Sequence, residues 1–356
     1  MINLLLLFIP LAIVLEHLAP EHHLLVFVAS GLAILPLAAW MGRATEHLAE
    51  RMGEGVGGLL NATFGNAAEL IIALAALRAG FYDVVKASII GSIVGNILLV
   101  LGAAMLAGGL RHREQHFNVA GARAQATMMT LAAITLILPA AFQVALGEGA
   151  AAPLIPLSVS ISVVLLVVYG LFLVYSLVTH SSLFLGSRAS EKEGHSPPWS
   201  TRRAALVLGI ATVAIAWMSE ILVGAIQPTA RDLGLSSAFI GVFVVAILGN
   251  AAEHTTAIGV AMKDRMDLSL SIAIGSSVQV AVFVAPVLML VSLVLGPAPM
   301  DLAFPKGLVL IVLLSVLIAG QVANDGRSDW LKGVQLLAVY AVIGLTFFFL
   351  PDALPR

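Results

Sequence analysis

Cysteine is absent from this chain of 356 residues and charged residues are scarce, and each shortage excludes some classes of protein or site. There is no cysteine, which excludes disulfides and thiolate metal sites and leaves oxygen and imidazole as possible metal ligands. Charged residues make up only 11% of the chain, against about a quarter in soluble proteins. The formal net charge of −2 provides no basic stripe for nucleic acid. Neither a Gly-x-Ser-x-Gly elbow nor a His-Glu-x-x-His pair is present to indicate an enzyme.

Apolar sequence is abundant instead. Hydrophobic residues make up 60% of the chain, and the mean hydropathy is +1.03. A helix that crosses a bilayer needs about 20 apolar residues, and proline, glycine and charge clusters mark where such runs end. The pattern predicts an all-α polytopic membrane protein of about eleven spans. These are residues 2–18, 22–41, 55–77, 84–110, 122–146, 154–179, 204–226, 236–262, 268–295, 302–320 and 330–350.

The spans group into two repeats. Residues 1–19 are expected to form an extra membrane helix that is retained, because no positive n-region or Ala-x-Ala cleavage signal accompanies them. Residues 20–180 and 204–356 predict two five-helix repeats, joined by a flexible hydrophilic linker at 181–203. Because five is odd, the second repeat is inverted relative to the first, as in many transporters.

Lysine and arginine indicate the orientation. Thirteen of the eighteen basic residues fall on one predicted side, and the other five on the opposite side. By the positive-inside rule the larger group and the N-terminus face the cytoplasm. The smaller group is Arg78, Lys86, Arg231, Lys306 and Arg356. In a prokaryote the expected location is the plasma membrane.

One short tract occurs twice. Residues 65–69 and 249–253 both read Gly-Asn-Ala-Ala-Glu, and residues 91–94 match 275–278 at the same offset of 184 positions. Each copy places a glutamate, Glu69 or Glu253, inside an apolar span, where a carboxylate costs about 2.5–3.5 kcal/mol. A protonated carboxyl that only links helices is the structural alternative. Matched acids in two repeats favour a symmetric cation site at the membrane midplane.

Two carboxylates are too few for a hard divalent cation. Ca²⁺ takes about six to eight oxygen ligands. The Gly-Asn pairs are expected to loosen each helix and free the carbonyls of Gly65 and Gly249 as further ligands. Asn66 and Asn250 lie three residues before their glutamates on the same helical face, so either amide could orient a carboxylate or bond a neighbouring helix.

The second repeated tract contributes polar groups to otherwise apolar spans. Ser92 and Asn96 share a helical face, as do Ser276 and Gln279. Such groups often serve only as hydrogen bonds between helices, worth about 0.6 kcal/mol on average. Their recurrence in both repeats favours a place along the ion pathway.

Three further titratable residues are candidates. His254 follows Glu253 at about 100° around the helix, and is either a packing residue or a neighbour that holds or relays a proton. Glu46 and Glu220 each follow a hydroxyl residue and precede their repeat's signature, so they are candidate gate acids for the two entry paths. Glu46 can also be read as an ordinary interfacial charge.

Residues 61–69, 249–254 and 275–279 resemble the two signature regions of calcium/proton antiporters, the CAX branch of the calcium:cation antiporter superfamily. The resemblance implies Ca²⁺ bound between Glu69 and Glu253, protons as the counter-ion, and gating by the second and seventh helices. The chain departs from the family in its linker, where only Glu191 and Glu193 stand where members often carry a strongly acidic stretch.

The function that these features predict is a secondary active transporter, not an enzyme, in which Ca²⁺ and protons compete for two glutamates during alternating access. Its partners would be Ca²⁺, protons and the lipid bilayer, with no cofactor and no nucleic acid.

A sodium/calcium exchanger of the same superfamily is the alternative. Sodium-coupled relatives typically place an acid in the second signature helix, and none stands there. A passive divalent-cation channel is less favoured, because channels usually form a ring around an axis normal to the membrane. Oligomeric state is left open.

Overall fold

The computed structural model describes residues 2–52, 57, 59–60, 63–147, 151–180 and 199–349. Several sequence predictions fall outside these residues. They are the start of the third span from residue 55, positions 61 and 62 of the first signature, residues 181–198 of the predicted linker with Glu191 and Glu193, and the C-terminal residues from 350.

The chain divides into two compact units, and each unit combines segments from both predicted repeats. Unit 1 comprises residues 1–91, 197–252 and 344–356, and unit 2 comprises residues 92–196 and 253–343. The borders fall inside three helices, α5 (Tyr82–Val94), α12 (Ala246–Ala261) and α16 (Trp330–Phe348). Two of these borders lie in the repeated tracts, after Gly91 and before Glu253.

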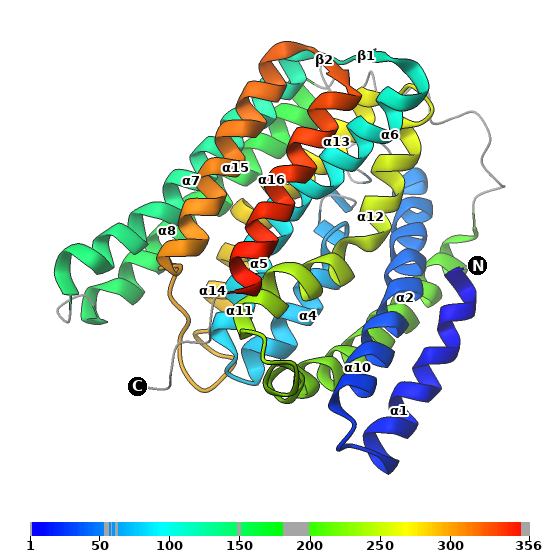
Figure 1. The fold of residues 1–356 in the computed structure, drawn as a ribbon, viewed down its shortest axis with the longest axis vertical. Helices are drawn as coiled ribbons and strands as arrows, with labels where there is room; N and C mark the ends of the chain where they lie inside the picture. Colours follow the sequence, from blue (N-terminus) through cyan, green and yellow to red (C-terminus); the bar gives the residue numbers. More distant parts are fainter. Residues whose placement is uncertain are drawn as a thin grey trace. The chain divides into compact units, whose positions relative to one another are not determined.

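Unit 1 is built around two long helices. Its elements are η1 (Ile2–Leu7), α1 (Phe8–Leu18), α2 (His23–Met52), α4 (Ala67–Arg78), α10 (Thr201–Leu233), α11 (Ser237–Phe239) and the π-helical segment η6 (Ile240–Val245). Helix α10 packs along α2 and also contacts α4, and α1 lies against α2 (Figure 1). Gly91 of α5 approaches η6 so closely that a Cβ there would lie 2.2 Å from the carbonyl oxygen of Val242.

The end of the predicted linker is anchored to α2. The Trp199 carbonyl accepts a hydrogen bond from Arg51 Nε at 3.0 Å, and its ring lies 4.9 Å from that of His47. The guanidinium of Arg203 lies 4.7 Å from the Trp199 ring centre. Helix α10 begins directly afterwards, because the Ser200 hydroxyl caps it by accepting from the Arg203 amide at 3.3 Å.

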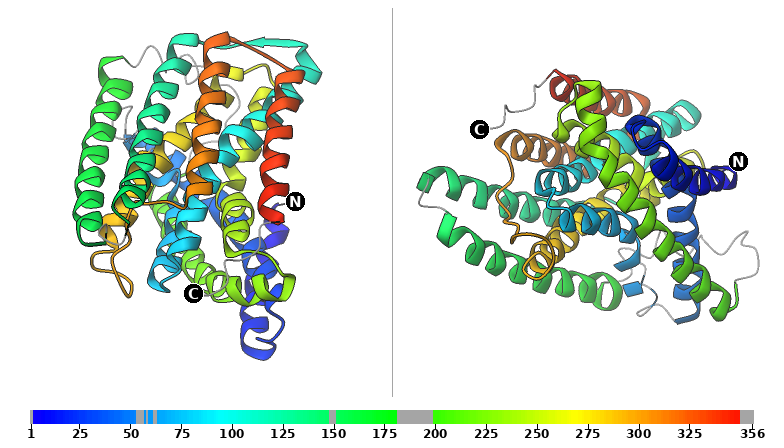
Figure 2. Two further views of the ribbon diagram at one scale, coloured as in Figure 1. Left: turned by 60° about the vertical axis from the view of Figure 1, so that its left-hand side comes forward. Right: turned by 90° about the horizontal axis from the view of Figure 1, so that it is seen from below.

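Unit 2 is a bundle of apolar helices. Its elements are η2 (Gly95–Val100), α6 (Leu101–His112), β1 (Glu114–His116), α7 (Val119–Leu146), α8 (Ala151–Val174), η4 (Tyr175–Thr179), α13 (Met266–Gln279), η7 (Val280–Val284), α14 (Ala285–Val291), α15 (Lys306–Asp325) and β2 (Arg327–Asp329). Helix α7 packs against α15, α13 and α8, so these helices run side by side (Figure 2). Helices α13 and α6 also pack together.

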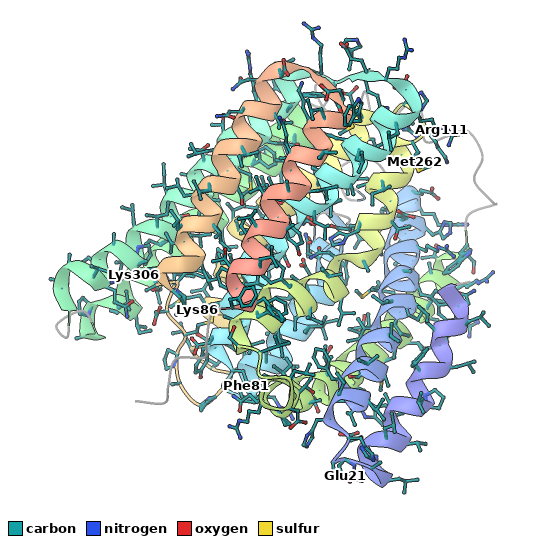
Figure 3. The ribbon with its side chains drawn as sticks, in the orientation of Figure 1. Glu21, Phe81, Lys86, Arg111, Met262 and Lys306 are labelled. Carbon is teal, nitrogen blue, oxygen red and sulfur yellow. The ribbon has the colours of Figure 1, made fainter. Side chains whose placement is uncertain are left out.

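A polar cap closes one end of unit 2. Strands β1 and β2 pair antiparallel, with Gln115 opposite Ser328. The buried Gln115 amide donates to the Ala261 carbonyl and to Asp264 Oδ1, both at 2.9 Å. Arg111 and Met262 lie at this end (Figure 3), where His112 Nε2 is 3.0 Å from the Met262 carbonyl oxygen. The cap ties the end of α12 to the loop after α6.

The predicted class, an all-α polytopic membrane protein, is confirmed. Among the described residues, nine helices are long and apolar enough to cross a membrane, and the predicted spans correspond to them within a few residues at most ends. The first predicted span forms a shorter apolar helix, Asn3–Leu18. The third is represented by α4, with the rest of that span partly outside the described residues. Helix α2 runs eleven residues past the predicted end at residue 41, to Met52.

Two wide helical turns occupy matching places in the repeats. The π-helical segment η2 covers residues 95–100, which the offset of 184 maps onto residues 279–284, and η7 covers 280–284. Segment η2 begins directly after residues 91–94 of the second repeated tract and contains Asn96, and η7 begins directly after Gln279. Single π turns inside α-helices recur at functional sites, because they redirect side chains without ending the helix.

Candidate functional site

Glu69 occupies the first turn of α4 because the chain turns immediately before it. Residues Gly65 and Asn66 form a turn, and Asn66 takes non-helical dihedrals of φ −99° and ψ 19° as the residue before the helix. Glu69 is therefore the third residue of α4, and its side chain is buried with 9% exposure. A helix N-terminus carries a partial positive charge and unsatisfied amide hydrogens. The turn thus gives a buried carboxylate a compensating electrostatic environment.

Glu69 meets the second signature within unit 1. Asn250 Nδ2 donates a hydrogen bond to Glu69 Oε1, and the same amide donates to the Ala246 carbonyl at 3.0 Å. Gly249 provides the room for this approach, since a Cβ at that position would lie 2.8 Å from Glu69 Cγ. The Asn250 amide therefore orients the carboxylate of the other repeat and, by the same hydrogen bond, links two helices. The sequence had left these two roles as alternatives.

The expected loosening of the helix occurs in only one of the two copies. The Gly65-Asn66 pair forms a turn, as predicted, and Gly65 is exposed. Gly249 and Asn250 instead lie inside the continuous helix α12, so the prediction of a loosened helix there is wrong. The reason is that Gly249 serves close packing against Glu69 rather than backbone freedom.

Glu253 belongs to a second polar cluster, in unit 2. Its carboxyl forms a hydrogen bond with the Ser276 side chain. The Ser276 hydroxyl in turn accepts from Asn96 Nδ2 at 3.2 Å, and the Asn96 carbonyl oxygen lies 3.2 Å from His254 Nε2. The chain of contacts leaves α12 at Glu253, passes through α13 and η2, and returns to α12 one residue later.

The hydrogen bonds of this cluster are all donated in the same order, from His254 toward Glu253. An amide oxygen can only accept, so His254 Nε2 donates to Asn96, and Asn96 donates to Ser276. The Ser276 hydrogen then remains for the carboxylate of Glu253. The second carboxyl oxygen of Glu253, Oε2, is buried and has no hydrogen-bond partner within the described part of the chain. One oxygen is thus oriented by the protein, and the other is available to a cation or a proton.

The remaining polar candidates lie close to these clusters in sequence. Asn66 is buried beside the α4 turn with 3% exposure, and Ser92 is buried at the start of the unit 2 part of α5. Gln279 is the last residue of α13, directly before η7. Ser277, next to Ser276, bonds backbone instead, donating to the Ala273 carbonyl at 2.9 Å.

The two predicted gate acids occupy different environments. Glu46 lies on the exposed side of α2, and its neighbour Thr45 is buried and bonds the Met41 carbonyl at 2.9 Å. Glu220 lies on α10 and forms an ion pair with Arg78 at the end of α4, with 3.0 Å between Oε1 and Nη1. Glu220 is therefore held at the end of α4 by an arginine, about two turns beyond the turn that carries Glu69.

Sequence reasoning missed two residues near these sites. Arg78 was read only as a topology marker, although it is the partner of Glu220. Gln125 of α7 is buried, donates to Ser271 Oγ at 3.3 Å, and lies 3.5 Å from where a Gly275 Cβ would stand. Gln125 could have been found as a polar residue inside the span 122–146. The Arg78 contact depends on how α4 packs against α10 and left no signal in the sequence.

Comparison with known families gives a match over most of the chain. The model of a family described as sodium/calcium exchanger protein matches residues 22–178 and again residues 203–349. The two matched segments flank the predicted linker.

Known relatives resemble the chain over nearly its full length. It is 48% identical over 343 residues to the Ca²⁺/H⁺ antiporter of a Synechocystis strain, covering 92% of this chain and 91% of that protein. It is 42% identical to the Ca²⁺/H⁺ antiporter ChaA of Bacillus subtilis, covering 91% and 92%. Among solved structures, native YfkE superposes with a TM-score of 0.84 at 37% identity, covering 98% of this chain and all of that one. An H⁺/Ca²⁺ exchanger CAX shares the fold, with a TM-score of 0.73 at 15% identity, covering 98% of this chain and 91% of that one.

Proposed function

Because the chain belongs to the sodium/calcium exchanger protein family, we propose that it exchanges Ca²⁺ for protons across a membrane by alternating access. The names of its relatives in Synechocystis and Bacillus subtilis support Ca²⁺ and H⁺ as the exchanged ions. The observation that carries the proposal is the repeated glutamate, since each copy lies in an apolar helix with a side chain that orients its carboxylate.

Glu69 would bind the cation through an oriented carboxylate. Asn250 donates to one carboxyl oxygen, and Glu69 itself lies in the first turn of α4. A preorganised carboxylate loses little conformational freedom when a cation binds, which favours affinity. Gly249 lets α12 approach closely enough for the amide to reach Glu69. The Gly65 carbonyl, at the turn before α4, stays proposed as a further oxygen ligand, whereas the predicted Gly249 carbonyl lies inside the continuous helix α12.

Glu253 would provide the second carboxylate and take part in proton coupling. Its Oε2 atom can hold either a proton or part of a cation's coordination shell, and it cannot hold both at once. His254 begins the donor chain and is the nearest titratable residue in sequence, so a proton leaving or reaching Glu253 would alter its environment. Competition at the two glutamates then couples the ions: Ca²⁺ arrives as protons leave, and protons arrive as Ca²⁺ leaves.

The driving force available to such exchange is sufficient. Each pH unit across the membrane supplies about 1.4 kcal/mol per proton, which corresponds to about tenfold accumulation of the coupled ion. Two protons per Ca²⁺ would be electroneutral. Three would add a voltage contribution of about 2.3 kcal/mol per 100 mV.

A sodium/calcium exchanger is the second candidate, because the matching family is described by that activity. Against it, Ser92, Asn96, Ser276 and Gln279 supply no acid to the second signature helix of either repeat. Proton coupling is therefore the function that the polar residues support best.

The membrane orientation is proposed from the basic residues. The N-terminus would face the cytoplasm of a prokaryotic cell, and residues 20–180 and 204–356 would form the two inverted repeats. An odd number of helices per repeat presents the two signatures from opposite sides, which suits a site that opens alternately.

Uptake of radiolabelled Ca²⁺ into reconstituted vesicles tests the coupling. An imposed pH gradient, acid inside, should drive Ca²⁺ accumulation, because protons leaving the vesicle release energy for the exchange. A sodium gradient at equal pH on both sides should drive none. Vesicles without protein and a protonophore that collapses the gradient are the controls. Sodium-driven uptake at constant pH would assign the protein to the sodium-coupled function instead.

Removing the donor to Glu253 tests the second cluster. Ser276→Ala should raise the Ca²⁺ concentration for half-maximal uptake about tenfold, because a hydrogen bond to a charged group contributes about 1.5–3 kcal/mol. The matched control is the adjacent Ser277→Ala, whose hydroxyl bonds backbone carbonyls. Equal effects of the two substitutions would show that Ser276 acts only through helix packing.

A further inference from the structure

Arg78 and Glu220 form an ion pair between two helices of unit 1. The Arg78 Nη1 atom lies 3.0 Å from Glu220 Oε1, and the side chains are 66% and 52% exposed. Arg78 is the last residue of α4, the helix whose first turn carries Glu69. Glu220 lies well inside α10, which also packs against α2. The pair therefore links the helix that carries Glu69 to the helix expected to gate access.

Glu220 stands in an apolar stretch of α10, where an ion-pair partner stabilises a carboxylate. The acid lies within the apolar run 204–226, with Ile221, Leu222 and Val223 directly after it. A carboxylate in such a run is unfavourable unless it meets a partner or reaches an interface. Trp217, one turn earlier, is half-exposed, and tryptophan favours the membrane interface. Glu21 and Phe81, which follows α4 closely, both lie toward one end of unit 1 (Figure 3).

Neighbouring residues on α10 face different ways. Ser219 is fully buried, whereas the adjacent Glu220 lies at the edge of the packed face, where Arg78 can reach it. Arg78 lies nine residues after Glu69, which is about 13 Å along the axis of α4. A movement of α10 away from the end of α4 larger than these side chains can follow would separate the two charges.

The geometry points to Arg78 as a positioning residue of the transporter, which acts through Glu220 to hold α10 against α4. The transport effect rests on the proposed function, because it assumes that α10 moves during exchange. The contact that carries the role is the one between Arg78 Nη1 and Glu220 Oε1, which needs a positive charge at this position and no second arm of a guanidinium. Lysine should therefore replace arginine, and the two charges should be exchangeable between the helices.

This role can be tested by reversing the charge of Arg78, of Glu220 or of both, and measuring uptake of radiolabelled Ca²⁺. Arg78→Glu and Glu220→Arg should each lower the maximal uptake rate at least about fivefold, with the half-saturating Ca²⁺ concentration unchanged. The double variant R78E/E220R should recover to within about twofold of the parent, as should Arg78→Lys. Asp232→Asn is the matched control, since it removes an acid that pairs with His23 at the end of the same helix.

A second measurement does not depend on which ion is transported. Because the chain has no cysteine, Ser219→Cys introduces a single thiol on the buried face of α10. Labelling by a water-soluble maleimide should be slow in this background. It should accelerate at least about fivefold when Arg78→Glu is added, and slow again in the charge-exchanged variant.

The two measurements separate the possible failures. If the parent protein took up no Ca²⁺, the proposed function would be contradicted. The labelling test of the Arg78–Glu220 contact could still be carried out. The role of Arg78 is overturned if the double variant is no better than the single ones, if the single variants match the parent, or if Asp232→Asn causes an equal loss.

Discussion

Replacing Glu69 or Glu253 with glutamine should abolish Ca²⁺-dependent proton exchange and leave the protein folded. Glutamine keeps the shape of the side chain and its capacity to hydrogen-bond, but it removes the charge that a divalent cation requires and the oxygen that a proton binds. Loss of one partner from a buried charged site costs about 3–5 kcal/mol, which corresponds to a reduction of more than about a hundredfold. Calcium-dependent proton release from vesicles, measured with a pH-sensitive dye, is the assay.

The control for this experiment is an acid outside both clusters. Glu21→Gln changes an exposed residue at the turn before α2 and should leave exchange within about twofold of the parent, since exposed charges contribute little. Unchanged elution volume and melting temperature in detergent would show that each variant is folded. Near-normal exchange by either the Glu69 or the Glu253 variant would refute the role of that carboxylate.

A side chain at Gly249 should impair transport nearly as strongly, although the residue bears no charge. A Cβ there would lie 2.8 Å from Glu69 Cγ, which is closer than real Cβ atoms approach other heavy atoms. In Gly249→Ala the Glu69 side chain or α12 must shift, which disturbs the contact with Asn250, and Gly249→Val requires a larger shift. We expect a loss of at least about tenfold for alanine and a larger loss for valine, because a displaced ligand forfeits 1.4 kcal/mol or more. Ca²⁺ uptake is the measurement.

Gly259, on the same helix, gives the matched control. A Cβ at Gly259 would meet nothing within 4 Å, so Gly259→Ala should transport normally. Alanine should also favour the helix by about 1 kcal/mol relative to glycine, which would appear as an equal or higher melting temperature. Normal uptake by Gly249→Ala would mean that the close contact with Glu69 does not position the carboxylate.

The sequence predicted the acids better than it predicted the roles of their neighbours. Glu69 and Glu253 stood out because a carboxylate inside an apolar span is costly, and a repeated one is more unusual still. The Gly-Asn pairs were expected to act alike because they are identical. In the structure one pair turns the chain before α4, while the other lies inside α12 and contacts Glu69. The two identical Gly-Asn pairs have different structural roles because the helices that carry them pack against different neighbours.

The polar residues of the second tract show the same limit. Helical spacing grouped Ser92 with Asn96 and Ser276 with Gln279, since spacing describes only one helix at a time. The contacts found in unit 2 run between helices instead, from Asn96 to Ser276 and from Asn96 to His254. Arg78 was likewise placed by its charge, and its partner on α10 came from packing.

Composition and periodicity by themselves determined that this chain is a helical membrane protein with a duplicated acidic signature. They could do so because bilayer thickness fixes helix length, and the cost of burying charge makes each exception visible. Only the tertiary structure decided which amide meets Glu69, which serine meets Glu253, and which arginine meets Glu220. Those pairings depend on how helices distant in the chain approach one another, and that approach is set by side-chain packing, for which one sequence carries no local pattern.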